Sequence, residues 1–382
     1  MGCCHKKRKR NTLLKKYDED ENEQNEEPDS NAIIVKLTYN EFIPLKLLGR
    51  GSFGQVILAR LKINNKLYAM KILDKSQLKI KHQEVHTKAE RDLMVKINCP
   101  FIVNIKSAFQ DERYLYIVSD FMQGGDMYYH MHEAHKLDFE LTQFYIAEIV
   151  LAIEYLHKNN MVYRDLKPEN ILLDSKGHIK LTDFGLSKML NSSKDKAFTI
   201  CGTPQYLAPE VFIHKGYDKN VDWWSLGCLI FEMLTGQLPF NIKRGSKINL
   251  DIYKQNIKFP RFLDEDSKDL IRKLLIFDPK KRLGSGKNGA EEIKKHPFFD
   301  EIDWKDFWNR KIIPPFKPDL EDETDLKYFD TQFTSEPVES FSKNPRSREA
   351  SYEYKNFTYI TESVKNELMV FNNKDDMDNG YE

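Results

Sequence analysis

The hydrophobic pattern becomes regular near Phe42, after a polar leader. Residues 42–48, 55–61 and 67–73 form short runs rich in β-branched and apolar residues, which predict three strands. Residues 114–119 predict a further strand. Between them, apolar positions recur at the spacing of a helix face, at Val85, Ala89, Leu93 or Met94, and Ile97.

From residue 141 onward the pattern becomes helical. A broad apolar face is formed by Phe144, Ile146, Ala147, Val150, Leu151 and Leu156. A sheet-rich part followed by a helix-rich part predicts an α+β fold with two lobes and a cleft between them. The folded body is expected to span residues 42–299.

The segments on either side of this body differ from it. Residues 1–38 form a charged leader that we expect to be disordered. Residues 300–361 keep aromatic side chains without periodicity, which predicts an extended tail lying on the body. Residues 362–382 are polar and predict a disordered end.

Charge and cysteine content narrow the class of protein. The 382 residues carry 59 basic and 59 acidic side chains, so net charge does not favour a nucleic-acid partner. The charge is uneven, with a basic block at residues 6–10 and an acidic stretch at 18–29. The five cysteines are scattered apart from one adjacent pair, which favours neither a disulfide framework nor a zinc site and indicates a reducing, cytoplasmic environment.

A glycine-rich segment joins the first two predicted strands. Residues 49–56 read GRGSFGQV, and glycines let backbone N–H groups approach phosphate oxygens closely. A strand follows this segment, where a dinucleotide fingerprint requires a helix. A hairpin turn without a ligand would also explain the glycines. The ordered set that follows favours phosphate binding: Lys71 lies on the third strand, and Glu90 on the next helix is the candidate to hold it.

Two further motifs carry the chemistry of phosphoryl transfer. Residues 163–170 read YRDLKPEN, and residues 183–185 read DFG. Such transfer depends on positioning and charge stabilisation. Asp165 would accept the substrate hydroxyl proton, and Lys167 would steady the transferring group. Asp183 and Asn170 are hard oxygen ligands suited to Mg²⁺.

Together these motifs resemble the eukaryotic protein kinases over residues 42–298. Tyr163 in place of the usual His, with TICGTP at 199–204, resembles the AGC group. The resemblance implies ATP bound between the lobes and a pair between Arg282 and Glu210. The implied ATP-binding residues are Leu48, Gly49, Gly51, Ser52, Phe53, Gly54, Val56, Ala69, Lys71, Asp120, Met122 and Leu172.

The tail is similar to that of AGC kinases, nearest to the ribosomal-protein kinases and protein kinase B. This similarity implies a turn motif at residues 337–340 with Ser340 as phosphoacceptor and a hydrophobic motif at residues 354–359 with Thr358 as phosphoacceptor. Tyr354 stands where that hydrophobic motif usually has Phe. Thr199 is the expected acceptor on the activation segment, with Arg164, His86 and Lys188 around its phosphate. An upstream kinase resembling the phosphoinositide-dependent kinase would phosphorylate it.

Substrate preference follows from the same resemblance. Asp126, Glu169 and Glu232 match acidic positions that select Arg near the phosphoacceptor. Surface charges without a role are the alternative. Ser119 falls at the position beside the adenine, where the group usually has a larger Met or Leu. The resemblance further implies a monomer.

The N-terminus resembles an acylated membrane anchor. Gly2 would carry myristate, and Cys3 or Cys4 palmitate, with the basic block of residues 1–10 facing an anionic membrane surface. Lys6 departs from the myristoylation pattern. A disordered basic tail or a nuclear-import signal is the alternative.

Two other functions are alternatives to catalysis. A pseudokinase scaffold would require damage at Lys71, Glu90, Asp165, Asn170 or Asp183, and all five are intact. A membrane adaptor acting through the basic leader would leave the kinase-like body unexplained.

Overall fold

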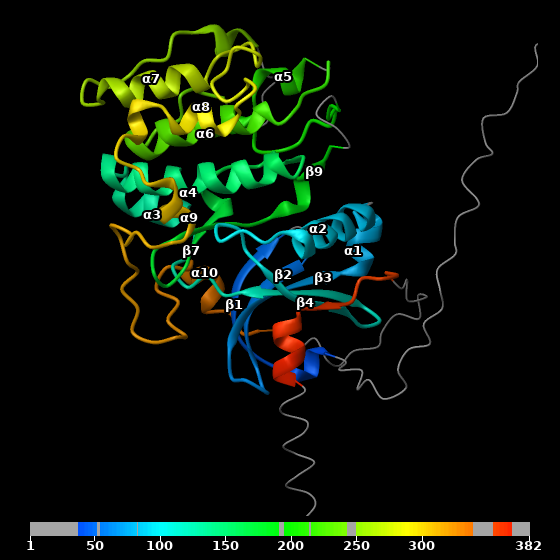
Figure 1. Cartoon of the computed structure of the whole chain (residues 1–382). Helices are drawn as coiled ribbons and strands as arrows, with labels where there is room; N and C mark the ends of the chain where they lie inside the picture. Colours follow the sequence, from blue (N-terminus) through cyan, green and yellow to red (C-terminus); the bar gives the residue numbers. More distant parts are fainter. Residues whose placement is uncertain are drawn as a thin grey trace, which may run out of the picture. The chain divides into compact units, whose positions relative to one another are not determined.

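The six-stranded antiparallel sheet of the small lobe has the strand order β1-β2-β3-β5-β4-β10. The structure is a computed structural model that describes residues 37–51, 54–81, 83–190, 195–213, 215–242, 250–338 and 354–368. The strands are β1 (Phe42–Gly51), β2 (Gly54–Leu61), β3 (Leu67–Asp74), β4 (Ile105–Gln110), β5 (Tyr114–Asp120) and β10 (Tyr359–Ile360). The helices α1 (Lys75–Ile80) and α2 (Glu84–Lys96) follow β3 and lie beside the sheet (Figure 1).

The large lobe is mainly helical. Its helices are α3 (Met127–Ala134), α4 (Phe139–Lys158), α5 (Pro209–Phe212), α6 (Asn220–Thr235), α7 (Glu265–Leu274), α8 (Ala290–Lys294) and α9 (Trp304–Trp308). Two small antiparallel pairs join β6 (Met161–Val162) to β9 (Lys188–Met189) and β7 (Ile171–Leu173) to β8 (Ile179–Leu181). Short 3₁₀ turns are η1 (Tyr39–Glu41), η2 (Pro168–Asn170), η3 (Phe184–Leu186), η4 (Pro204–Tyr206), η5 (Leu250–Lys254) and η6 (Pro297–Phe299).

Helices α4 and α6 form the core of the large lobe. Helix α6 is buried on nearly every side, including Trp223 and Trp224, which explains its almost continuous apolar sequence. Beside it, the buried Arg282 donates two hydrogen bonds to Glu210, of 2.8 and 3.0 Å. The expected pairing of these two residues is therefore confirmed.

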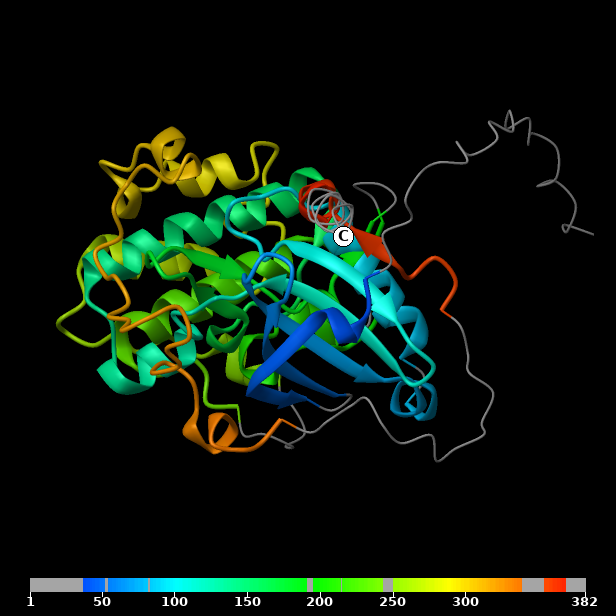
Figure 2. The ribbon, with the colours of Figure 1, turned by 90° about the horizontal axis from the view of Figure 1, so that it is seen from below.

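The tail lies on the body, as expected, and runs from the large lobe to the small lobe (Figures 1 and 2). Its rings pack on the body: Phe316 and Tyr328 contact His130, and Phe329 stacks on Phe121 at 5.7 Å. Further on, α10 (Thr331–Thr334) leads to Glu336, which pairs with Arg50 of β1 at 2.6 Å.

The expected disordered end is wrong for its first residues. Residues 362–368 are helical, and Val364 and Leu368 are buried on the small lobe. These two apolar residues are four positions apart, so they lie on one face of the helix. The few apolar residues of this polar segment are therefore sufficient to order it.

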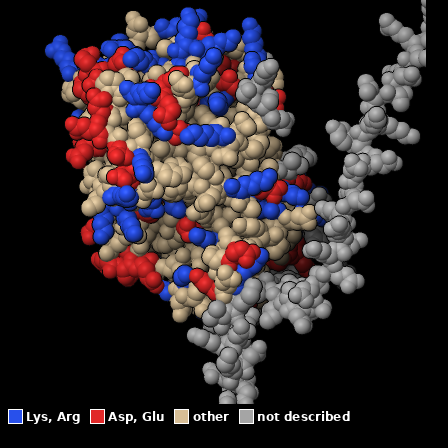
Figure 3. Space-filling model, viewed as in Figure 1, with Lys and Arg blue, Asp and Glu red and all other residues tan. Residues whose placement is uncertain are grey.

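The surface mixes both signs of charge. Figure 3 shows basic and acidic side chains interspersed over the face in view, with acidic ones gathered at the lower left, where Figure 1 draws the tail in orange. Within the described residues, no helix has the length and apolar character needed to cross a bilayer.

Candidate active site

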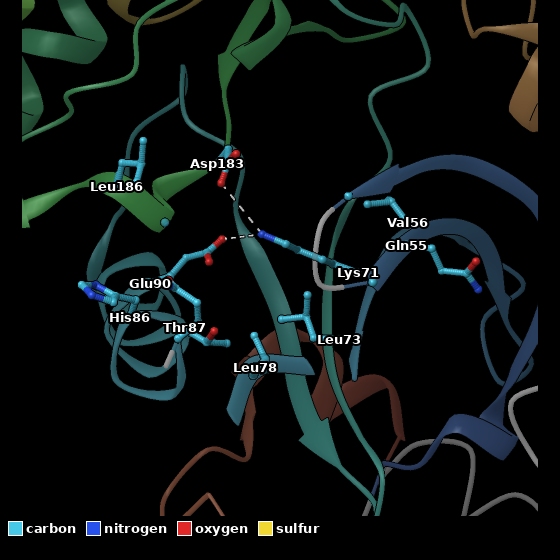
Figure 4. A pocket seen from close by; sticks show the side chains of 14 residues that line it. Gln55, Val56, Lys71, Leu73, Leu78, His86, Thr87, Glu90, Asp183 and Leu186 are labelled. Carbon is cyan, nitrogen blue, oxygen red and sulfur yellow. Dashed lines mark hydrogen bonds and ion pairs between the residues drawn. The ribbon is translucent and has the colours of Figure 1, made fainter. Parts of the chain in front are cut away.

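Lys71, Glu90 and Asp183 meet where the small lobe faces the large lobe. Lys71 Nζ lies 2.8 Å from Glu90 Oε1 and 3.9 Å from Asp183 Oδ1 (Figure 4). Burial disfavours the charge of Lys71, but the two carboxylates outweigh it and raise the pKa of Lys71 above its ordinary value. The predicted pairing of Lys71 with Glu90 is confirmed.

Helix α2 buries Leu93, Met94 and Ile97 as predicted, but it also buries polar residues. Ala89 is exposed, whereas the polar residues Thr87, Glu90 and Arg91 are buried together with Met94. The expected place of Ala89 on the buried face is therefore wrong. The ion pair of Glu90 with Lys71 compensates the burial of a charge and allows the polar side to face inward.

A cavity of about 380 Å³ lies beside this ion pair. Its lining includes Gly51, Gly54, Val56 and Gly185 together with the three charged side chains, so it joins the glycine hairpin to α2 (Figure 4). At Gly54 a Cβ atom would lie 1.8 Å from the Ile72 carbonyl oxygen, so only glycine fits there. The predicted phosphate contacts Ser52 and Phe53 lie outside the described residues.

The catalytic loop holds Asp165 through three neighbours. Asp165 Oδ2 accepts a hydrogen bond of 2.8 Å from Asn170 Nδ2 and lies 3.0 Å from Lys167 Nζ. Asp165 Oδ1 accepts bonds from Thr203 N at 3.2 Å and Thr203 Oγ1 at 3.3 Å. Lys167 Nζ also donates to Thr203 Oγ1 at 3.1 Å, so the activation segment and the catalytic loop share one network.

Asp222 on α6 fixes the backbone of this loop, a role that the sequence analysis missed. Its carboxylate accepts bonds from Tyr163 N at 3.0 Å and Arg164 N at 2.8 Å, and it contacts His157 Nε2 at 2.8 Å. Arg164 has φ of 71°, a conformation that needs such support. The available signal was an Asp in the first turn of a largely apolar helix, since a charged group is costly to bury without partners.

Asp183 and Asn170 suit a shared metal ion. Both amide hydrogens of Asn170 are used by Asp165, since Nδ2 also donates to the Asp165 carbonyl at 2.9 Å. The amide oxygen of Asn170 is therefore the atom left to bind a cation, as is the carboxylate of Asp183. No group of three His, Cys, Asp or Glu side chains that could hold a metal occurs in the described part of the chain. Two protein oxygens supplemented by phosphate oxygens and water fit Mg²⁺.

The predicted adenine side is formed by apolar and backbone groups of both lobes. In the sheet register, Gly49 pairs with Val56 and Ala69 with Ser119. Ser119 Oγ lies 3.5 Å from the Ala69 carbonyl. Asp120 ends β5 and Met122 follows it, while Leu48 is half-buried on β1 and Leu172 is half-buried on β7.

The three acidic residues proposed for substrate recognition lie close enough to interact. Burial raises the pKa of Asp126 and of Glu232, and the charge of Glu169 raises both further. Glu169 itself is exposed. Asp126 caps α3 by accepting a bond of 2.8 Å from Tyr129 N, and Tyr206 Oη donates to Glu232. The structure thus brings together carboxylates that are far apart in sequence.

The proposed phosphoacceptors differ in their surroundings. Thr199 is exposed, and its carbonyl accepts a bond of 2.6 Å from Tyr217 Oη, which in turn accepts one of 3.1 Å from Arg164. Thr358 is exposed next to the fully buried Phe357. His86 lines the cavity, and Lys188 is half-buried on β9. Ser340 and the lipidation candidates Gly2, Cys3 and Cys4 lie outside the described residues.

Comparisons with known proteins agree with this geometry. Residues 42–299 match the family model described as "Protein kinase domain". The chain is 45% identical over 335 residues to ribosomal protein S6 kinase 2 alpha of Gallus gallus, covering 87% of this chain and 44% of the relative. It is 45% identical to serine/threonine-protein kinase gad8 of Schizosaccharomyces pombe, covering 86% and 58%, and 43% identical to serine/threonine-protein kinase YPK1 of Saccharomyces cerevisiae, covering 87% and 49%. The chain therefore spans about half of the length of these relatives.

Proposed function

Because this chain belongs to the protein kinase family and, within it, to the AGC group, we propose that it transfers the γ-phosphoryl group of ATP to Ser or Thr hydroxyls of basic protein substrates. The observation that carries the proposal is the arrangement of Lys71, Glu90 and Asp183 around one cavity, with the hydrogen-bonded Asp165 on the catalytic loop. An intact set of these side chains speaks against a pseudokinase scaffold.

The chain's own residues account for each part of the reaction. The substrate hydroxyl oxygen attacks the γ-phosphorus as the bond to the β-phosphate oxygen breaks, and ADP leaves. Asp165 accepts the hydroxyl proton, because its two oxygens are already oriented by Asn170 and Thr203. Lys167 and Lys71 stabilise negative charge on the transferring and non-transferring phosphates. Asp183 and Asn170 would hold Mg²⁺, which neutralises phosphate charge when bound.

The substrate class follows from the acidic group of Asp126, Glu169 and Glu232. A guanidinium forms charge-assisted, often bidentate bonds with carboxylates. We therefore expect Arg three residues before the phosphoacceptor, with further basic preference at two or five residues before it.

Regulation would act through two threonines. Phosphate on Thr199, added by an upstream kinase resembling the phosphoinositide-dependent kinase, would recruit Arg164 and order the activation segment. Phosphate on Thr358 would strengthen the contact of the tail with α2.

For residues 1–10 we propose acylation and contact with the cytoplasmic face of a membrane, on the sequence alone. A Gly2→Ala protein that still fractionates with membranes would contradict the anchor.

The central experiment uses peptide libraries with the purified full chain, before and after phosphorylation of Thr199. We expect Mg²⁺-dependent transfer to Ser or Thr peptides with Arg upstream, a marked increase after phosphorylation, and loss of transfer in Asp183→Ala. Full activity in Thr199→Ala would overturn the switch, and the absence of any basic preference would overturn the substrate class.

A further inference from the structure

The chain continues past its hydrophobic motif and pairs with the edge of the small-lobe sheet. Strand β10 lies antiparallel to β4, with Tyr359 opposite Ala108 and Ile360 opposite Ser107. Thr361 N then donates a bond of 2.9 Å to the Lys106 carbonyl. Figure 2 shows this segment in red along the sheet edge. An edge strand of a sheet offers unpaired backbone groups, and here the protein's own tail uses those of β4.

The helix at 362–368 anchors this strand on the far side from the hydrophobic motif. Val364 is 4% exposed and Leu368 is 5% exposed. Glu367 pairs with Lys66 Nζ at 2.6 Å and accepts a bond of 2.6 Å from Asn64 Nδ2, both at the turn between β2 and β3. The anchor thus combines apolar burial with charged contacts.

The hydrophobic motif itself is bound between α1, α2 and β4, with Lys75 Nζ of α1 5.7 Å from the Tyr354 ring centre. Phe357 is fully buried, with the Arg91 guanidinium 5.5 Å from its ring centre. Arg91 also donates to the Asn356 carbonyl. The Gln110 side chain donates a hydrogen bond of 2.9 Å to the Tyr354 carbonyl and accepts one of 3.1 Å from Tyr354 N.

We propose that residues 359–368 form a clasp that keeps Phe357 packed against α2 whether or not Thr358 is phosphorylated. Phe357 lies two residues from Tyr359, so it can move only about 7 Å along an extended chain while β10 stays paired. Rebinding of a released Phe357 is then intramolecular, at a high effective concentration. A phosphate on Thr358 adds to this binding instead of being required for it.

The inference rests on the proposed function for its activity readout. It departs from a simple phosphorylation switch at Thr358, because it predicts that Thr358 and the clasp act redundantly. Only the loss of both should release Phe357 and disturb Glu90, which precedes Arg91 on α2.

The test compares a clasp variant, Val364→Asp/Leu368→Asp, with a charge-matched control, Ser363→Asp/Asn366→Asp, whose two positions are exposed. Each variant is made in two backgrounds, one with Thr358 and one with Thr358→Ala. All of these proteins are phosphorylated at Thr199. We expect Thr358→Ala alone to keep at least half of wild-type kcat/KM, and Thr358→Ala with the clasp variant to lose at least tenfold. The control should lose less than twofold in either background.

Hydrogen exchange of residues 105–110 and 359–361, which form the pairing of β4 with β10, gives a readout independent of catalysis. Both segments should exchange faster in the clasp variant than in the wild type, and their exchange should be unchanged in the control. A tenfold loss in Thr358→Ala with the clasp intact would overturn the proposal, as would unchanged exchange in the clasp variant. A charge reversal, Glu367→Lys, should accelerate exchange, and adding Lys66→Glu should restore it. If the wild type transferred no phosphate, the proposed function would fail, and exchange would still decide the clasp.

Discussion

Glu90 and Arg91 are consecutive residues of α2, yet they contact different parts of the protein. Glu90 holds Lys71 in the active site, and Arg91 holds the backbone and ring of the tail at Asn356 and Phe357. A rotation of α2 about its axis would disturb both contacts at once. The tail and the nucleotide site are therefore coupled through one turn of helix.

This coupling predicts that Arg91→Ala lowers catalysis from a distance. The lost cation–π contact and hydrogen bond correspond to about 1–2 kcal/mol, or roughly a tenfold fall in kcat/KM. Steady-state kinetics with a basic peptide measures it. Asp92→Ala, which removes the 2.9 Å partner of Arg91, and Lys96→Ala, exposed at the end of α2, serve as controls and should change kcat/KM less than threefold. A normal kcat/KM in Arg91→Ala would contradict the coupling.

Thr203 is expected to act as a positioning residue for Asp165. Its hydroxyl joins Asp165 Oδ1 and Lys167 Nζ, so Thr203→Ala should lower kcat by about 10–100-fold, a part of the roughly 10²–10⁴-fold that a positioned acid or base contributes, with little change in KM for ATP. Thr203→Ser keeps the hydroxyl and should restore most of kcat. Separate measurement of kcat and KM for the two variants distinguishes this role from a loss of folding, which the serine variant would not rescue.

The buried pair of Arg282 and Glu210 is expected to be structural. Arg282 also donates to the Asn220 carbonyl at 2.6 Å, and its guanidinium lies 5.2 Å from the Trp224 ring centre. Removing one partner of a buried pair leaves the other charge uncompensated and costs about 3–5 kcal/mol. Arg282→Ala should lower the free energy of unfolding of the large lobe by that amount in denaturant titrations. Arg272→Ala, at a half-exposed position, is the matched control and should cost under 1 kcal/mol.

The sequence was most informative where chemistry depends on residues close in the chain. The motifs at 163–170 and 183–185 named Asp165, Asn170 and Asp183, and the strand pattern placed Lys71 correctly. On α2 the predicted apolar face was correct at Leu93, Met94 and Ile97 and wrong at Ala89. The neighbouring Glu90 is buried by an ion pair, which an apolar pattern does not register. Contacts such as Asp222 with Arg164 join residues 58 positions apart, and nothing in a single sequence pairs them.

Two elements, strand β4 and the helix at 362–368, were also missed by the sequence pattern. Strand β4 was not predicted, because residues 105–110 lack a clear alternation of apolar and polar positions. The helix at 362–368 was missed because its composition is polar. Its signal was the spacing of Val364 and Leu368, which becomes decisive only once a surface is present to bury both.

The preference for basic substrates should weaken at a higher pH than the one at which ordinary carboxylates gain protons. Burial and Glu169 raise the pKa of Asp126 and Glu232, so these carboxylates gain protons, and lose their charge, as the pH falls through values above the ordinary carboxyl range of about 4.3. The ratio of kcat/KM for an Arg peptide to that for its citrulline analogue should therefore decline at mildly acidic pH. Asp126→Asn should flatten the decline. A ratio that stays constant down to the ordinary carboxyl range would refute the assignment.

Ser119 should make the adenine side of the site accept larger purines. The register of β3 with β5 places Ser119 opposite Ala69, two residues from the partner of Lys71, which supports its predicted position beside the nucleotide. A Ser side chain leaves space that a Met would fill. We expect N6-benzyl-ATP to be used with kcat/KM within about tenfold of ATP, an order-of-magnitude estimate for a ligand that fits a preformed pocket. Ser119→Met should lower use of the analogue at least 30-fold while changing use of ATP less than threefold, and Ser119→Ala should keep both. Equal rejection of the analogue by the wild type and Ser119→Met would mean that other side chains close this part of the site.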